Sequence, residues 1–389
     1  MTKASKEGQR KAPILRFKGF TDDWEQRKLG NLFNERKERS TEGELLSVTL
    51  SNGVTKFSDL NKKDNSNIKS GNYKIVKRND IPYNSMRMWQ GASGVSSYDG
   101  IVSPAYTVLI PNKNSNSNFY AVLFKKKSIL NLFTRFSQGL TSDTWNLKYP
   151  ILKDINVPFT NLEEQKRIFK IFNVVNNLLA LYDRKTKLIK QIQSSFLDCF
   201  FSETNNVTSL NHFLRIRNGY AFKSSELTEN GEIPVVKISN IGSNKPFTFT
   251  TKAKSKEQFT LYPNDIIIAL SGATAGKINQ VANKYPLYYQ NQRVGFFEIK
   301  NDRLNCEYLN SFLHSKKFKS QLQKTLVAGA QPNITPKDIE KIKIPFLEYE
   351  LQQTIGQVNK YLFELQRINK DKLTLLNKIK KTLLNNMFV

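Results

Sequence analysis

Two segments of this chain, about half its length apart, follow the same pattern. INVPFTNLEEQKRI at 155–168 aligns without a gap with IKIPFLEYELQQTI at 342–355. In this alignment Gln165 falls on Gln352. Because a long-period repeat indicates that one structural unit is written twice, we predict two halves with the same architecture.

Each copy of the repeat opens a segment whose apolar residues recur in steps of three and four, as in an amphipathic helix. The predicted seam of the first helix is Ile168, Phe172, Val175, Leu179, Tyr182 and Ile189, and that of the second is Leu351, Ile355, Val358, Leu362 and Leu365. Asn369 and Lys372 add polar groups to the second seam, which in coiled coils fixes the register of paired helices. A long helix with a narrow seam needs a partner. The two copies in one chain can supply each other's partner, the alternative being two helices that each pack on their own domain.

The segments before the two helices are rich in β-branched and aromatic residues, which favour strands. The candidate strands are 44–50, 100–110 and 118–124 in the first half and 233–239, 265–270 and 293–299 in the second. The predicted fold class is α/β (α+β), with two tandem domains that are each followed by a long helix. The predicted boundaries are 1–160 for the first domain, 161–203 for its helix, 204–346 for the second domain and 347–389 for its helix.

The charge of the chain points to a polyanionic partner. It carries 60 Lys and Arg against 33 Asp and Glu, a formal net charge of +27, and such an excess favours binding to nucleic acid. The two histidines, His212 and His314, are too few for a metal site built from several imidazoles. Cys199 and Cys306 are expected to be buried thiols without a disulfide framework.

We expect the protein to work in the cytoplasm and not to enter a membrane. The amino-terminal residues 1–17 contain no apolar stretch of the kind found in secretory signals. No window of the sequence approaches the roughly 18 apolar residues of a membrane span. The chain also has no Pro-Pro pair, and therefore no tetrapeptide typical of an amino-methyltransferase centre.

The stretch LSGATAGKI at 270–278 has the look of a phosphate-binding loop but does not match one. That motif needs four residues between its glycines and a hydroxyl after the lysine. Gly272 and Gly276 are separated by three residues, and Ile278 stands where the hydroxyl should be. We predict instead a turn whose backbone N–H groups, with Thr274 and Lys277, face a phosphate of a DNA backbone.

Several motifs together resemble the DNA-specificity subunit of a Type I restriction-modification system. They are WEQRKLGNLF at 24–33, the repeated Pro-Phe segment that opens each helix, SGATAGKI at 271–278 and NQRV at 291–294. The resemblance covers essentially the whole chain. In the first half MRMWQGASG, at 86–94, stands opposite LSGATAGKI without matching it.

The resemblance implies two target-recognition domains held apart by an antiparallel pair of helices, each reading one half of a split sequence in double-stranded DNA. It implies no catalytic centre, metal site or cofactor on this chain. The helices of such proteins dock two modification (methyltransferase) subunits, which use S-adenosylmethionine to methylate adenine N6. Restriction (translocase) subunits, which use ATP and Mg²⁺, add cleavage.

Residue chemistry selects the candidate DNA contacts within these motifs. Arg and Lys suit guanine O6 and N7, Asn and Gln suit adenine N6 and N7, and hydroxyl and cationic side chains suit phosphates. The predicted DNA-binding residues are Arg87, Gln90, Lys223, Ser271, Thr274, Lys277, Gln290, Asn291, Gln292 and Arg293. Trp89 and Tyr106 are predicted to be core aromatics, and the Lys run at 125–127 a solvated loop.

Two other functions remain open at this point. A self-contained nuclease would use Asp265 and the Glu298-Ile299-Lys300 segment, a loose echo of the acidic pair and lysine that hold Mg²⁺. A stand-alone bipartite DNA-binding regulator would explain the charge and the duplication, but it would leave the outer faces of two long helices unused.

Overall fold

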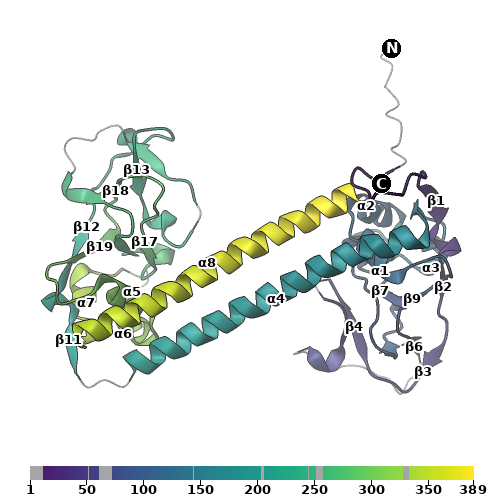
Figure 1. Ribbon diagram of the computed structural model, residues 1–389, viewed down its shortest axis with the longest axis horizontal. Coiled ribbons are helices and arrows are strands. Elements are labelled where there is room, and N and C mark those ends of the chain that lie inside the picture. Colours follow the sequence, from purple (N-terminus) through teal and green to yellow (C-terminus); the bar gives the residue numbers. More distant parts are fainter. Residues whose placement is uncertain are drawn as a thin grey trace, which may run out of the picture. The chain divides into compact units, whose positions relative to one another are not determined.

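The computed structural model describes residues 12–50, 52–60, 72–142, 144–202, 206–243, 245–250, 257–326 and 333–389. The chain forms two compact units, residues 1–182 with 372–389 and residues 183–371. Each unit is a mixed α/β structure that contributes parts of two long helices, drawn in teal and yellow in Figure 1. The predicted fold class is therefore confirmed. Among the described residues no helix is long and apolar enough to span a membrane.

The first unit is built on short antiparallel sheets covered by helices. One sheet has the order β2 (Phe33–Glu35), β9 (Tyr106–Pro111), β7 (Ile81–Asn84), and another has the order β3 (Arg39–Ser40), β6 (Tyr73–Val76), β8 (Gly100–Val102). Two further pairs are β4 (Leu46–Thr49) with β5 (Gly53–Lys56) and β1 (Glu25–Lys28) with β10 (Asn156–Phe159). The helices are α1 (Ser117–Leu123), α2 (Lys127–Phe136), α3 (Tyr149–Leu152) and the long α4 (Leu162–Phe201).

The second unit repeats this plan. Its sheets have the orders β12 (Leu214–Asn218), β19 (Val294–Ile299), β16 (Ile266–Ala269), β17 (Ile278–Gln280), and β14 (Thr248–Thr250), β13 (Ile233–Val236), β18 (Tyr288–Gln290), β15 (Thr260–Leu261). β11 (Val207–Ser209) pairs with β20 (Lys343–Pro345). The helices are α5 (Cys306–His314), α6 (Lys316–Leu326), α7 (Pro336–Glu340) and the long α8 (Tyr349–Asn386).

The two units share a topology as well as an order of elements. The three-stranded arrangement β2–β9–β7 of the first unit has the same chain order as β12–β19–β16 of the second. In each unit a strand near the start pairs with the strand that leads into the long helix, β1 with β10 and β11 with β20. The repeat seen in the sequence therefore extends through both domains.

A buried glutamine gives the repeated motif a structural role. Gln165, on the first turn of α4, is fully buried. Its Nε2 donates to the carbonyl oxygens of Thr160 (2.7 Å) and Asn114 (3.1 Å), and its Oε1 accepts from the backbone N–H of Asn116 (2.8 Å). Asn116 is itself the N-cap of α1, so this one amide ties the start of α4 to the start of α1.

Gln352 does the same in the second unit. Its Nε2 donates to the carbonyls of Leu347 (2.9 Å) and Arg303 (3.1 Å), and its Oε1 accepts from the N–H of Asn305 (3.0 Å), the N-cap of α5. The aligned glutamines therefore make equivalent sets of three hydrogen bonds, each at the junction of a domain and its long helix.

The core of the first unit includes the last residues of the chain. The ring of Phe388 lies 5.3 Å from that of Phe119, 5.7 Å from Phe172 and 6.3 Å from Trp24, measured between centroids. The backbone N–H of Leu15 donates to the carbonyl of Asn386 at 2.9 Å. The end of α8 is thus part of the hydrophobic core that also contains α1 and α4.

The two long helices contact one another within each unit. In the first unit Lys372 of α8 lies over the ring of Tyr182 of α4. In the second unit Gln193 of α4 donates to Asn359 of α8 (2.8 Å) and accepts from Gln366 (2.7 Å). Early α4 thus meets late α8, and late α4 meets early α8, as in the predicted antiparallel pair.

The predicted seam is right for α4 and partly wrong for α8. On α8, Leu351, Val358 and Leu365 are 41%, 38% and 43% exposed. Ile355 and Leu362 of the predicted seam are buried or half-buried, as is the predicted polar position Asn369, and the inner face also carries Gln352, Asn359 and Gln366. The exposed and the inner positions both have helical spacing, and the amides of Gln352, Asn359 and Gln366, which have hydrogen-bond partners, take inner positions in place of three of the predicted apolar residues.

Two other expectations need correction. The segment 118–124, predicted as a strand, forms α1, because the side chain of Asn116 caps the helix by accepting from the N–H of Phe119 at 3.0 Å. Cys199 and Cys306, predicted to be buried, are both exposed free thiols.

Candidate nucleic-acid interface

Four loops of the second unit gather at one end of its sheets. β13 and β18 are parallel, so both end at the same edge. β12 and β16 are each antiparallel to β19, and both end beside its start. We call the segments that follow these strands, residues 219–223, 237–243, 270–277 and 291–293, the second-domain loop cluster.

Backbone hydrogen bonds join these loops to one another. The N–H of Tyr220 donates to Gln290 O (2.8 Å), and Tyr220 O accepts from the N–H of Gln292 (2.9 Å). The N–H of Leu270 donates to Arg293 O at 3.0 Å. Gly219 is held closest, because a Cβ there would lie 2.3 Å from the carbonyl oxygens of both Gln290 and Asn291. The cluster is therefore a fixed surface that needs a glycine at this position.

The turn at 270–277 uses much of its own backbone. Gly272 and Gly276 adopt left-handed φ values of +73° and +81°, which favour glycine. The N–H groups of Ala275, Gly276 and Lys277 donate to Gly272 O (2.9 Å), Ala269 O (2.8 Å) and Thr274 O (3.0 Å). The expectation that this turn offers its N–H groups to a phosphate is wrong for these three. The exposed ammonium of Lys277 is left to make such a contact.

The predicted residues of the second unit fall into three groups. Lys223, Lys277, Gln292 and Arg293 are exposed on the loop cluster, and Ser271, Thr274 and Asn291 are half-buried there. Gln290 is fully buried, and its Nε2 donates to Arg217 O (2.6 Å) and Val294 O (2.7 Å). Gln290 therefore holds the strand end in place, and its amide does not face solvent.

Lys237 is a cation of this cluster that the sequence reading missed. It is half-buried, directly after β13, and its backbone N–H donates to the side chain of Asn240 at 2.9 Å. Its position after a buried strand, equivalent to that of the other loops, is the signal that could have found it.

The first unit places loop 85–93 at the corresponding point, directly after β7, as 270–277 follows β16. Arg87 and Gln90 are exposed on this loop. Trp89, predicted to be a core residue, is half-buried; its ring lies 5.2 Å from that of Trp145 and its Nε1 donates to Met86 O. Tyr106, also predicted to be in the core, is half-buried at the start of β9. The structure therefore puts the two unlike motifs, MRMWQGASG and LSGATAGKI, in equivalent places.

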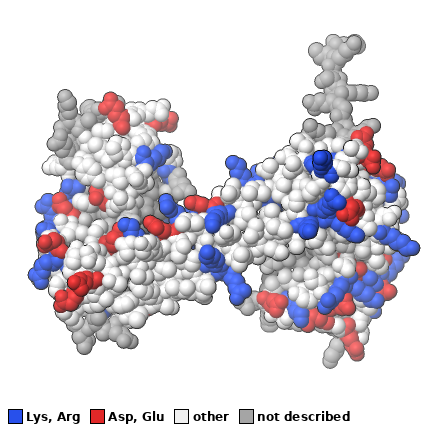
Figure 2. All heavy atoms as spheres, in the orientation of Figure 1, with Lys and Arg blue, Asp and Glu red and all other residues white. Residues whose placement is uncertain are grey.

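On the face drawn in Figure 2 the positive charge is distributed rather than gathered. Figure 2 shows Lys and Arg spread over both units among acidic side chains on the face it presents. Of the Lys run at 125–127, only Lys127 is exposed, while Lys125 and Lys126 are half-buried. The nitrogen of Lys126 donates to Phe388 O and Val389 O, each at 2.7 Å. The prediction of a solvated loop is therefore wrong for two of these lysines.

The acidic pair considered for a nuclease is not arranged for metal binding. Glu298 is paired with Arg215 and lies 3.7 Å from Arg217, and the hydrogen bond from Arg215 lowers the pKa of its carboxyl group. Asp265 accepts from the N–H of Tyr262 at 2.7 Å, and burial raises its pKa. Asp265 precedes β16, whereas the loop cluster follows it. A metal site at Glu298 and Asp265 is therefore disfavoured, because two guanidinium groups lie beside Glu298 and because Asp265 lies at the opposite end of β16 from the loop cluster.

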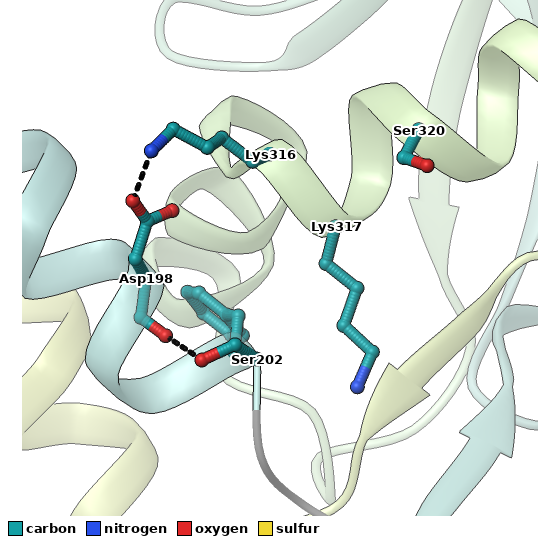
Figure 3. A pocket seen from close by; sticks show the side chains of 6 residues that line it. Asp198, Ser202, Lys316, Lys317 and Ser320 are labelled. Carbon is teal, nitrogen blue, oxygen red and sulfur yellow. Dashed lines mark hydrogen bonds and ion pairs between the residues drawn. The ribbon is translucent and has the colours of Figure 1, made fainter.

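The cavity drawn in Figure 3 lies where the end of α4 meets the start of α6. Lys316 turns to Asp198, with which it forms an ion pair, while Lys317 points away from that pair. None of the ten predicted DNA-binding residues lines this cavity. It is therefore separate from the candidate interface.

Comparison with known proteins gives a family match to both units. The family model "Type I restriction modification DNA specificity domain" matches residues 21–191 and again 202–380. The Type I restriction enzyme MjaVIII specificity subunit of Methanocaldococcus jannaschii is 26% identical over 344 residues, 80% of this chain and 78% of the relative. The putative MjaX specificity subunit of the same organism is 23% identical over 316 residues, 72% of this chain and 69% of the relative.

Solved structures share the fold. The Type I restriction-modification S subunit from M. genitalium superposes with a TM-score of 0.68 at 18% identity, covering 97% of this chain and 99% of the other. A chain from a structural study of assembly and conformational transition of the Type I system gives a TM-score of 0.51 at 17% identity, covering 94% and 97%. The duplication found in the sequence and topology is thus present in the family match as well.

Proposed function

The chain belongs to the Type I restriction modification DNA specificity family, and we propose that each of its two units recognises one half of a bipartite target in double-stranded DNA. It is a specificity subunit with two target-recognition domains. The observation that carries the proposal is the pair of unlike loops, 85–93 and 270–277, at equivalent points of one repeated topology. Two domains with the same topology and different loops would recognise two half-sites that differ in sequence.

The exposed residues of the loop cluster suit the two tasks of a DNA reader. Cations contact phosphates and set the register of the protein on the duplex, while a smaller set of side chains meets base edges. Lys223, Lys277 and Arg293 would supply phosphate or guanine contacts, and Gln292 would supply an adenine contact. Arg87 and Gln90 offer the same pairing of a cation with an amide in the first unit.

The outer faces of the long helices support the docking of partner subunits. Apolar side chains recur there at helical spacing, more than a third exposed: Val174, Leu178, Leu181, Leu188 and Ile192 on α4, and Leu351, Val358, Tyr361, Leu365, Ile368, Leu375 and Ile379 on α8. Contiguous exposed apolar surface marks interaction sites. We call these twelve residues the outer apolar stripes.

We propose that the stripes bind two DNA methyltransferase (modification) subunits, and that restriction (translocase) subunits join the same complex. S-adenosylmethionine, ATP and Mg²⁺ are then cofactors of those partners, and this chain supplies target choice without a catalytic group. The complex would act on cellular DNA in the cytoplasm. A stand-alone regulator is disfavoured because it leaves the outer apolar stripes without an occupant.

The decisive experiment is reconstitution. The chain is purified alone and together with the methyltransferase subunit of the same host, and methylated adenines are mapped on a mixed-sequence DNA library. We expect no cutting or methylation by the chain alone, and methylation at one bipartite sequence by the pair. Cleavage by the chain alone with Mg²⁺ would favour the nuclease. Methylation that did not depend on which specificity chain was present would refute the proposal.

A further inference from the structure

Lys125, which is not among the candidate DNA contacts, forms hydrogen bonds to loop 85–93, the candidate recognition loop of the first unit. Lys125 lies in the turn between α1 and α2 and is half-buried. Its ammonium group donates hydrogen bonds to the carbonyl oxygens of Gly91 and of Ser93, the latter at 3.0 Å. One side chain thus bridges two carbonyls of loop 85–93.

The two arms of this loop differ in exposure. Gly91, Ala92 and Ser93 are buried, whereas Arg87 and Gln90 are exposed. The arms are joined by backbone hydrogen bonds, since the N–H of Ala92 donates to Arg87 O at 3.1 Å. Gly91 connects the arms in a left-handed conformation with φ of +87°. The position of the buried arm therefore determines where the exposed arm presents its side chains.

We propose that Lys125 is a positioning residue for recognition of the first half-site, which sets the conformation of loop 85–93 through the carbonyls of Gly91 and Ser93 without touching DNA. This inference rests on the proposed function, because it requires that loop 85–93 reads DNA. It gives one lysine of a basic run a role in specificity instead of general attraction to phosphates.

The chemistry of the group fits a clamp. An ammonium has three donors and no acceptor, so it can donate to two carbonyl oxygens at once and hold them at a fixed separation. Burial lowers the pKa of Lys125 to about 8, with Lys380 contributing in the same direction. The group is therefore mainly charged at neutral pH, and its hydrogen bonds to carbonyls are charge-assisted.

The second unit supports its corresponding loop by a different contact. A Cβ on Gly276 would lie 2.8 Å from Cδ2 of Leu322 on α6, so the turn at 270–277 packs closely on an apolar side chain. In this unit the last residue before the turn between α5 and α6 is His314, and its Nδ1 lies 2.8 Å from the carbonyl oxygen of Asn310 in its own helix. A change at Lys125 should therefore act on one half-site alone.

The test compares Lys125→Met with Lys127→Met in complex with the methyltransferase subunit. Methionine keeps an unbranched side chain and removes the donor. Both variants lose one positive charge, so a general electrostatic effect would appear in both. Methylation rates are measured on the target duplex and on duplexes with single base changes in either half-site. The half-sites are assigned to domains beforehand by exchange of residues 206–345.

We expect Lys125→Met to reduce discrimination about tenfold at one or more base pairs of the first half-site, the order of one base contact. Discrimination in the second half-site should be unchanged in Lys125→Met. In Lys127→Met, discrimination should be unchanged in both half-sites. Lys125→Gln, which keeps a neutral donor, should lie between wild type and Lys125→Met. The retained second half-site also shows that the chain is folded.

Three outcomes overturn the inference. The first is unchanged discrimination in Lys125→Met, and the second is an equal loss of discrimination in Lys125→Met and Lys127→Met. The third is a loss of discrimination in both half-sites of Lys125→Met, which would mean that Lys125 stabilises the whole chain. A wild-type complex that methylates without a bipartite target would instead contradict the proposed function itself.

Discussion

At the scale of single residues, buried side-chain amides form hydrogen bonds with backbone groups that apolar side chains would leave unpaired. Gln165 and Gln352 each satisfy two carbonyls and one N–H where a domain meets its helix. A glutamine is suited to this junction because it carries a donor and an acceptor on one flexible side chain. Leaving such buried groups unpaired costs more than the net value of the bonds.

Gln165→Ala should therefore lower the stability of the first unit by about 1–3 kcal/mol, since three backbone groups lose their partner. All three tryptophans, Trp24, Trp89 and Trp145, lie in this unit, so tryptophan fluorescence during urea unfolding reports on it directly. Lys166→Ala, on the exposed neighbour, is the control. A shift no larger than that of the control would show that the hydrogen bonds of Gln165 contribute little.

Residue chemistry named plausible DNA contacts but could not place every one of them. Gln290 and Gln292 look alike in the sequence, yet Gln290 is buried and Gln292 exposed. The difference arises from β12 and the start of β19, which bring the carbonyls of Arg217 and Val294 to the amide of Gln290. Lys125 was misplaced for the same reason, because its partners lie more than thirty residues away.

At the scale of elements, the helices were predictable and the faces of α8 were not. The repeat and the spacing of apolar residues predicted the two long helices, whereas the segment 118–124, predicted as a strand, forms α1. On α8, however, a rule that sends apolar residues inward selects Leu351, Val358 and Leu365, which are exposed. The inner face carries Asn359 and Gln366 instead, bonded to Gln193. Pattern alone cannot tell a buried seam from an exposed apolar face when the residues of both recur at helical spacing.

This assignment of faces predicts the effect of charge on α4. Leu181 and Leu188 are 59% and 53% exposed, so the double variant Leu181→Glu, Leu188→Glu should fold normally. It should weaken binding of the methyltransferase subunit by at least about tenfold, because burying each leucine contributes roughly 1.5–3 kcal/mol. DNA binding by the chain alone should change little. Binding is measured by titration calorimetry.

Asn173→Glu adds a charge at a polar, exposed position of the same helix and serves as the control. Equal weakening in the control and the double variant would mean that charge, not loss of apolar contact, is responsible. Unchanged binding in the double variant would remove the outer apolar stripe of α4 from the proposed interface.

At the scale of the whole molecule, each unit carries its own sheets, helices and recognition loops. The second unit is one continuous stretch of chain, residues 183–371. Its recognition domain should therefore be exchangeable as a cassette, provided the ends of the exchange lie at β11 and β20, which pair with each other.

Replacing residues 206–345 with those of another member of the family should change one half of the methylated sequence and leave the other half and the gap between them as they were. The measurement is single-molecule mapping of methylated adenines. New sequence in both halves would contradict the assignment of one domain to one half-site. Exchange of the helices is not involved, so the gap acts as an internal control.

The position of Phe388 in the first core has a consequence for biosynthesis. Contacts between Phe388 and Trp24, Phe119 or Phe172 join residues that are translated far apart in time. The unit made second is complete in itself once residue 371 has emerged, whereas the unit made first still lacks residues 372–389. Contacts so distant in sequence form slowly, and surface awaiting them is prone to aggregation. We therefore expect the second unit to complete its fold before the first, and a nascent chain halted after residue 371 to expose to chaperones the rings that Phe388 would cover.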